Sequence, residues 1–125
     1  MPGSTPDWLL PGPFPAAFAT EERCTITELL NDPACPEVSL ALARVAPGVT
    51  TRLHALADTV ERYVIVEGEG RVEVGGEVVR VVPGDRVLIP AGVPQRITAL
   101  GPLPLVFHCV CTPRFRQENY ADLDD

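Results

Sequence analysis

The sequence predicts a single all-β domain, built as a β-sandwich or a closed antiparallel β-barrel, and three observations lead to that prediction. The chain has 125 residues, which suits one domain with one core. It contains 10 Gly and 14 Pro, and this many turn-forming residues are typical of a chain with many short strands. Between residues 20 and 112 no segment keeps a helical period. These observations exclude a coiled coil and a bundle of long helices.

The first segment, residues 1–20, is an apolar arm rich in proline, and it cannot form a regular helix. Its apolar side chains include Trp8, Phe14 and Phe18. An arm of this kind is expected to pack against the domain or against a second subunit. Three segments follow from the composition: the arm at 1–20, a β-domain at 21–115 and an acidic tail at 116–125.

Short runs of alternating or β-branched residues, each bounded by turn residues, predict the strands. In chain order these are Cys24–Leu29, Val38–Val45, Thr50–Leu56, Arg62–Glu67, Arg71–Val74, Glu77–Val82, Arg86–Ile89, Gln95–Leu100 and Leu103–Thr112. The turns between them fall at Asn31-Asp32-Pro33, Pro47-Gly48, Gly68-Glu69-Gly70, Gly75-Gly76, Pro83-Gly84-Asp85, Pro90–Pro94 and Gly101-Pro102. Gly75-Gly76 has the signature of a two-residue hairpin. Residues Glu118–Asp125 are expected to form a short acidic helix or a frayed tail.

The charge balance restricts the partners. Ten Lys and Arg residues against 17 Asp and Glu residues give a net charge of −7. An acidic surface repels phosphate groups and anionic lipids, which argues against nucleic-acid and membrane partners. No apolar run approaches the roughly 20 residues of a transmembrane helix, and the arm has no basic segment of a secretory signal. A cytoplasmic location is therefore expected.

The four cysteines, at positions 24, 35, 109 and 111, lack the spacing of a structural zinc site. All four are expected to be small buried apolar residues in a reducing cytoplasm. Strand alternation places Cys109 and Cys111 on the face shared by Leu105 and Phe107, which is the expected inward face.

A first motif lies around the third and fourth predicted strands. Gly48 is followed after five residues by His54, then after one by Leu56, after four by Glu61 and after six by Gly68. This spacing resembles the first signature of the cupin superfamily, in which the Leu56 position is a second histidine.

A second motif follows the Gly75-Gly76 hairpin. Gly84 is followed after five residues by Pro90, then after one by Gly92 and after two by Gln95. This resembles the second cupin signature, except that the family has histidine at Gln95 and asparagine at Ala99. The resemblance implies a small antiparallel jelly-roll barrel, also called a double-stranded β-helix, which most often forms a homodimer.

The resemblance also implies where a metal would bind. Carried over position by position, the family's ligand set becomes His54, Leu56, Glu61 and Gln95. Leucine cannot bind a metal, and a glutamine carbonyl is a weaker donor than imidazole. The remaining candidates, His54, Glu61 and Gln95, could hold one divalent ion such as Fe, Mn, Ni or Zn, or none.

Four further residues are candidates for contacts with a ligand. By alternation Arg52 shares the face of His54, where it could bind a carboxylate; the alternative is an ion pair near the rim of the barrel. Tyr63 could donate to a ligand or simply pack in the core. Cys109 and Cys111 could lie beside the pocket or merely fill space.

The resemblance implies a small-molecule cupin of unassigned substrate, and three functions remain open for it. One is a metal-dependent enzyme of the dioxygenase, isomerase or lyase type, with His54, Glu61 and Gln95 as ligands. The second is a metal-free binder or sensor of a small molecule that uses the same pocket. The third is a structural dimer whose barrel is closed and filled by side chains such as Leu56, Ile65 and Ile97.

Overall fold

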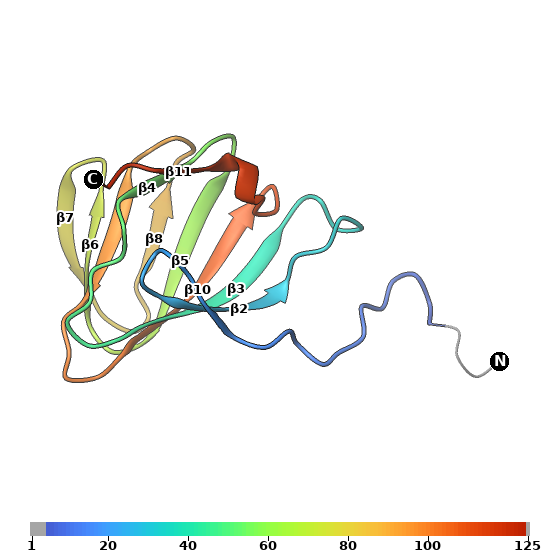
Figure 1. Cartoon of the computed structure of the whole chain (residues 1–125), viewed down its shortest axis with the longest axis horizontal. Coiled ribbons are helices and arrows are strands. Elements are labelled where there is room, and N and C mark those ends of the chain that lie inside the picture. The colour runs from blue at the N-terminus through green and yellow to red at the C-terminus, as the bar shows by residue number, and fades with distance from the viewer. Residues whose placement is uncertain (1–4, 125) are drawn as a thin grey trace.

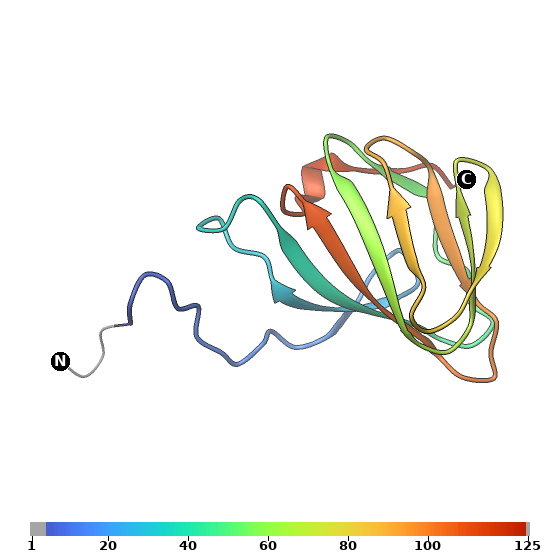
Figure 2. The same cartoon turned by 180° about the vertical axis from the view of Figure 1, so that it is seen from behind.

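Short strands pair into two antiparallel sheets in the computed structural model, which describes residues 5–124 (Figures 1 and 2). In spatial order the first sheet contains β1 (Phe18–Ala19), β2 (Thr25–Leu30), β3 (Ser39–Val45), β10 (Leu105–Thr112), β5 (Val60–Glu67) and β8 (Arg86–Ile89). The second contains β11 (Tyr120–Asp122), β4 (His54–Leu56), β9 (Gln95–Ala99), β6 (Gly70–Val74) and β7 (Glu77–Val81). The all-β prediction is confirmed.

Alternation along the long strands decides which side chains face the interior. On β5, Glu61, Tyr63 and Ile65 are buried, whereas the residues between them are more exposed. The pattern follows from the pleat, because successive side chains of a strand point to opposite faces. On β9 it buries Gln95 and Ile97 in the same way.

The interior has an apolar end and a polar end. Strands β3 and β10 pair over their whole length, with Leu105 opposite Val45 at one end and Cys111 opposite Ser39 at the other. Val45 and Leu105 are fully buried in the core cluster. Ser39 and Cys111 instead line a cavity, so a packed core supports the site from one end of the barrel.

The Gly75-Gly76 hairpin is confirmed. It joins β6 and β7, and both glycines have positive φ, 57° and 86°. Two positive φ angles are the requirement of a tight hairpin turn whose twist matches the strands, and glycine adopts them without steric strain.

Two elements differ from the sequence prediction. The strand predicted at Thr50–Leu56 shortens to β4, and Thr50 contributes only an isolated bridge to Thr98. The tail is neither a longer helix nor a frayed end: a single 3-10 turn, Gln117–Asn119, leads into β11, which pairs with β4. Pairing with β4 orders the tail because it satisfies backbone groups that a free end would leave to water.

The arm before β1 extends away from the barrel (Figures 1 and 2). Its apolar side chains are exposed: Trp8 is 83% exposed and Phe14 is 65% exposed. Within residues 5–124, no helix has both the length and the apolar character that crossing a membrane would need.

Candidate functional site

A cavity of about 680 Å³ opens between the inward faces of the two sheets. Its lining combines apolar residues such as Ile26, Leu56 and Phe107 with the polar residues His54 and Glu61. A volume of this size falls within the range of small-molecule pockets. The cavity argues against the expectation of a closed, filled barrel.

His54 projects from β4 and is held in one orientation. Its Nδ1 donates a hydrogen bond to the backbone carbonyl of Arg52 at 2.9 Å, and its ring stacks on Tyr120 with centroids 5.1 Å apart. The side chain is only 4% exposed. Because Nδ1 carries the donated proton, Nε2 is left as the proton acceptor of the neutral ring.

Glu61 lies on β5, and its carboxylate is buried in the lining of the cavity with 7% exposure. Its Oε2 accepts a long contact from Cys111 Sγ at 3.7 Å, while Oε1 has no hydrogen-bond partner among the described residues. Burial raises the pKa of Glu61, against the opposing effects of His54 and Gln95. A buried carboxyl oxygen without a complete hydrogen bond is costly, and the Gln95 amide beside the carboxyl reduces that cost.

Gln95 pairs with His54 across β4 and β9, so the structure brings His54, Glu61 and Gln95 to one region, as the cupin-like spacing implied. However, Gln95 is only 1% exposed and is not among the residues that line the cavity. Its carbonyl Oε1 accepts a hydrogen bond from the hydroxyl of Tyr63. Burial holds the pKa of Tyr63 well above its usual value, which keeps this hydroxyl a neutral donor.

These contacts decide how well the residues fit a cupin metal centre. The carbonyl oxygen of Gln95, its one plausible metal-binding atom, is engaged by Tyr63, and the position of a second histidine is filled by buried Leu56. Of the four ligand positions of the family, only those of His54 and Glu61 hold donors that line the cavity. Across residues 5–124, no group of three or more His, Cys, Asp or Glu side chains is arranged to hold a metal ion. The donor set therefore does not fit the family's metal centre.

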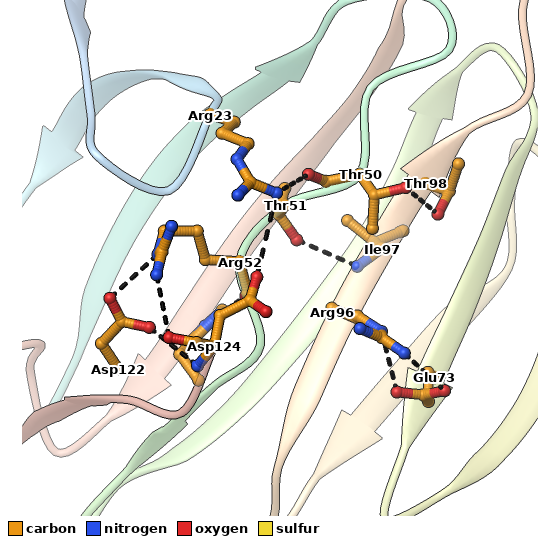
Figure 3. A network of polar contacts seen from close by, with 11 residues as sticks. Arg23, Thr50, Thr51, Arg52, Glu73, Arg96, Ile97, Thr98, Asp122 and Asp124 are labelled. Carbon is orange, nitrogen blue, oxygen red and sulfur yellow. Dashed lines mark hydrogen bonds and ion pairs between the residues drawn. The ribbon is translucent and has the colours of Figure 1, made fainter.

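Arg52 is not among the residues that line the cavity, and its side chain points toward Asp122 and Asp124 (Figure 3). Its Nε donates to Asp122 at 2.9 Å, and its Nη2 donates to the backbone carbonyl of Asp124 at 3.0 Å. Sequence alternation placed Arg52 beside His54, but residues before His54 are not in a regular strand, so the alternation does not extend to them. Arg52 instead fastens the C-terminal segment, including Tyr120, over His54.

Cys109 and Cys111 do line the cavity, as alternation predicted. Burial raises the pKa of both thiols, so they are neutral, apolar parts of the wall rather than reactive thiolates. All four cysteines are unpaired in the structure, but Cys35 is not buried, because it lies in an exposed turn beside Glu37.

Glu22 is a cavity residue that the sequence analysis missed. It lies in the turn between β1 and β2, and burial raises its pKa while His54 lowers it. Tyr120, on β11, was missed as well. No sequence signal could have found either, because alternation places residues only within strands, and β11 was not predicted.

Comparisons with known proteins agree with this architecture. The Cupin domain family model matches residues 41–111. An uncharacterized protein of Methanocaldococcus jannaschii, MJ1618, is 34% identical over 109 residues, which cover 86% of this chain and 87% of that protein.

Two solved structures share the fold. One is an uncharacterized conserved protein with a double-stranded β-helix domain from Klebsiella pneumoniae, with TM-score 0.72 and 18% identity over 85% of this chain and 84% of that chain. The other is Pac13 of Streptomyces, described as a nucleoside dehydratase, with TM-score 0.74 and 14% identity over 87% of this chain and 84% of that chain.

Proposed function

Because the chain belongs to the cupin family, we propose that its barrel binds a small polar molecule without a resident metal, and that His54 and Glu61 face this molecule as a proton-transfer pair. The single observation that carries the proposal is the composition of the cavity lining, in which His54 and Glu61 are the only donors left from the four ligand positions of the family, since Leu56 cannot bind a metal and Gln95 is not in the lining. The cavity remains open while the metal set stays incomplete.

The chemistry of the pair suits proton transfer. His54 presents Nε2 as an acceptor, and Glu61 is a carboxyl whose pKa burial raises, so it can hold a proton closer to neutral pH than an exposed glutamate. The reaction class that such a pair supports is an isomerisation or an elimination on a small substrate. A binder or sensor would use the same groups to hold its ligand.

The test is a thermal-shift screen of polar metabolites on protein that has been stripped with a chelator. Ligand binding to the native state raises the melting temperature by mass action, and the stripped protein should respond as strongly as protein supplied with Mn, Fe, Ni or Zn. His54→Ala and Glu61→Gln should abolish the shift, whereas Glu67→Gln, an exposed change outside the cavity, should keep it. A response that appears only after a divalent ion is added would support the metal-dependent enzyme instead.

We also propose that the protein is a homodimer of a reducing compartment. The exposed apolar side chains of the arm and the four unpaired cysteines support this.

A further inference from the structure

The cavity has a one-sided charge that the proposed function does not explain. Its described lining contains the carboxylates of Glu21, Glu22, Glu28, Glu61 and Asp122, whereas its only basic side chain is His54. Of these carboxylates, Asp122 is neutralised by Arg52 at 2.9 Å.

Local backbone geometry directs Glu22 inward and its neighbour outward. Arg23 has a positive φ of 71°, and its guanidinium donates to the backbone carbonyl of Thr50 at 3.3 Å (Figure 3). Glu22 lines the cavity, and its backbone carbonyl accepts a hydrogen bond from the backbone N–H of Arg52 at 3.2 Å. These contacts hold the turn against the barrel so that the Glu22 side chain faces the cavity and the Arg23 side chain lies outside it.

The side chains of Glu22 and Glu61 line the same cavity. Glu61 is buried and Glu22 is half-buried, and the charge of Glu22 raises the pKa of Glu61. Two carboxylates that face one cavity repel each other, and a cation placed between them would relieve that repulsion. The Glu61 side chain lines the cavity, and its Oε1 has no complete hydrogen bond within the described chain, although the Gln95 amide beside it lowers the pKa of the carboxyl.

The rest of the wall suits the body of an organic cation. Tyr63 and Phe107 pack with ring centroids 4.5 Å apart, and both rings line the cavity together with Tyr120 and Phe18. Aromatic faces attract cations and also bury apolar groups. A strongly hydrated inorganic ion would gain nothing from such a wall.

We propose that the ligand of this cavity is a small organic cation, an amine or quaternary ammonium carried on an apolar body, with its positive charge held by Glu22 and Glu61. The inference rests on the proposed function, since it assigns a substrate class to the same cavity. Glu22 is then a specificity-determining residue, because it selects for positive charge without being part of the His54–Glu61 pair.

The experiment compares three probes that share a phenyl ring and differ in charge: phenethylamine, 2-phenylethanol and 3-phenylpropionate. Titration calorimetry on the metal-stripped full chain should give the amine at least about tenfold tighter binding than the alcohol, and the carboxylate the weakest binding. Equal affinities for the amine and the alcohol would overturn the inference, as would preference for the carboxylate.

Variants that change the charge of a side chain with little change in its size test whether charge determines the affinity. Glu22→Gln should weaken the binding of the amine by at least about tenfold and change the affinity for the alcohol by less than about twofold. Glu67→Gln changes the net charge by the same amount but lies outside the cavity, so it should change neither affinity. Should Glu22→Gln fail to fold, Glu22→Ser, which removes the same charge at the same position, provides the same comparison.

The outcomes also distinguish this inference from the proposed function. If Glu22→Gln weakens the binding of all three probes equally, the proposed selection for positive charge is wrong, whereas the proposal of a small-molecule pocket still stands. If no probe binds at millimolar concentration, the inference is rejected, and the metabolite screen on stripped protein decides the proposed function separately.

Discussion

At the scale of single residues, Gln95 stands at a position where the cupin signature has a metal-binding histidine, and its contacts give it a different role. The residue occupies a metal-ligand position by its spacing, yet its carbonyl accepts the Tyr63 hydroxyl and its Nε2 has no complete hydrogen bond within residues 5–124. Its amide lies beside Glu61 and lowers the pKa of that carboxyl. Gln95 therefore acts as a support for Glu61 rather than as a wall of the cavity.

The raised pKa of Glu61 predicts a pH-dependent stability. An acid whose pKa is higher in the folded chain than its ordinary value of 4.5 binds more protons when folded, so the protein loses stability as pH rises from that value through the folded pKa. Glu61→Gln removes this loss. We expect the variant to melt higher than the unaltered protein at neutral pH, by at least about 3 °C, and to lose the advantage in acid.

Thermal unfolding followed by circular dichroism over a pH series measures this difference. Glu67→Gln, an exposed glutamate on the same strand, should follow the profile of the unaltered protein. Parallel profiles for Glu61→Gln and the unaltered protein would contradict the prediction.

A substitution at Leu56 gives a second prediction at the residue scale, which concerns metal affinity. Leu56→His restores the missing ligand position on β4, two residues from His54, where the side chain lines the cavity. With His54 and Glu61 it would supply three strong donors, so we expect Ni or Zn to bind at least about tenfold tighter than to the unaltered protein. Calorimetry measures the affinity, and adding His54→Ala should remove the gain. No gain in Leu56→His would mean that the three positions do not converge.

At the scale of elements, the turn between β5 and β6 depends on close approach of two backbones. Gly68 has a φ of 78°, and a Cβ atom there would overlap the carbonyl oxygen of Pro104. Gly76, in the next turn, has a similar φ of 86°, but nothing lies within 4 Å of a Cβ atom. The two glycines therefore separate the cost of backbone strain from the cost of a clash.

Alanine substitutions test this distinction. Gly76→Ala should cost about 1 kcal/mol of unfolding free energy from strain alone. Gly68→Ala carries the same strain plus a backbone clash that cannot relax, and should cost at least about 3 kcal/mol. Urea unfolding at equilibrium measures both values, and equal costs would show that the Pro104 backbone moves freely.

At the scale of the whole molecule, the arm is the feature that a single chain leaves unexplained. Trp8, Phe14 and Phe18 are exposed, although apolar side chains in this number are normally covered. We expect a second copy to cover them. Deletion of residues 1–17 should then convert a dimer to a monomer while the barrel keeps its β-sheet circular dichroism signal.

Light scattering gives the mass of both forms, and Trp8, the single tryptophan, reports on the arm itself. Its emission should shift to shorter wavelength as the protein concentration rises and the ring leaves water. A full-length chain that stays monomeric, with the emission of a solvent-exposed indole at all concentrations, would contradict the proposed dimer.

Much of the architecture could be predicted from the sequence, because it follows from local rules. Alternation placed Cys109 and Cys111 on the inward face of β10, and the glycine pair at 75 and 76 marked a hairpin. These two properties depend on strand period and turn chemistry, which neighbouring residues in the chain determine. The pairing of His54 with Gln95 across β4 and β9 joins distant segments, and only the resemblance to the cupin signatures implied it.

Only the tertiary structure determined which side chains face the cavity and which hydrogen-bond partners they have. The inward direction of Glu22, the outward direction of Arg52 and the engagement of Gln95 by Tyr63 depend on contacts between segments far apart in the chain. Turn residues have no fixed period, and an amide or a guanidinium takes whichever partner the packed fold brings near. Sequence alone therefore determined the barrel and the strands that bear the site, while long-range packing determined which polar atoms remain free to meet a ligand.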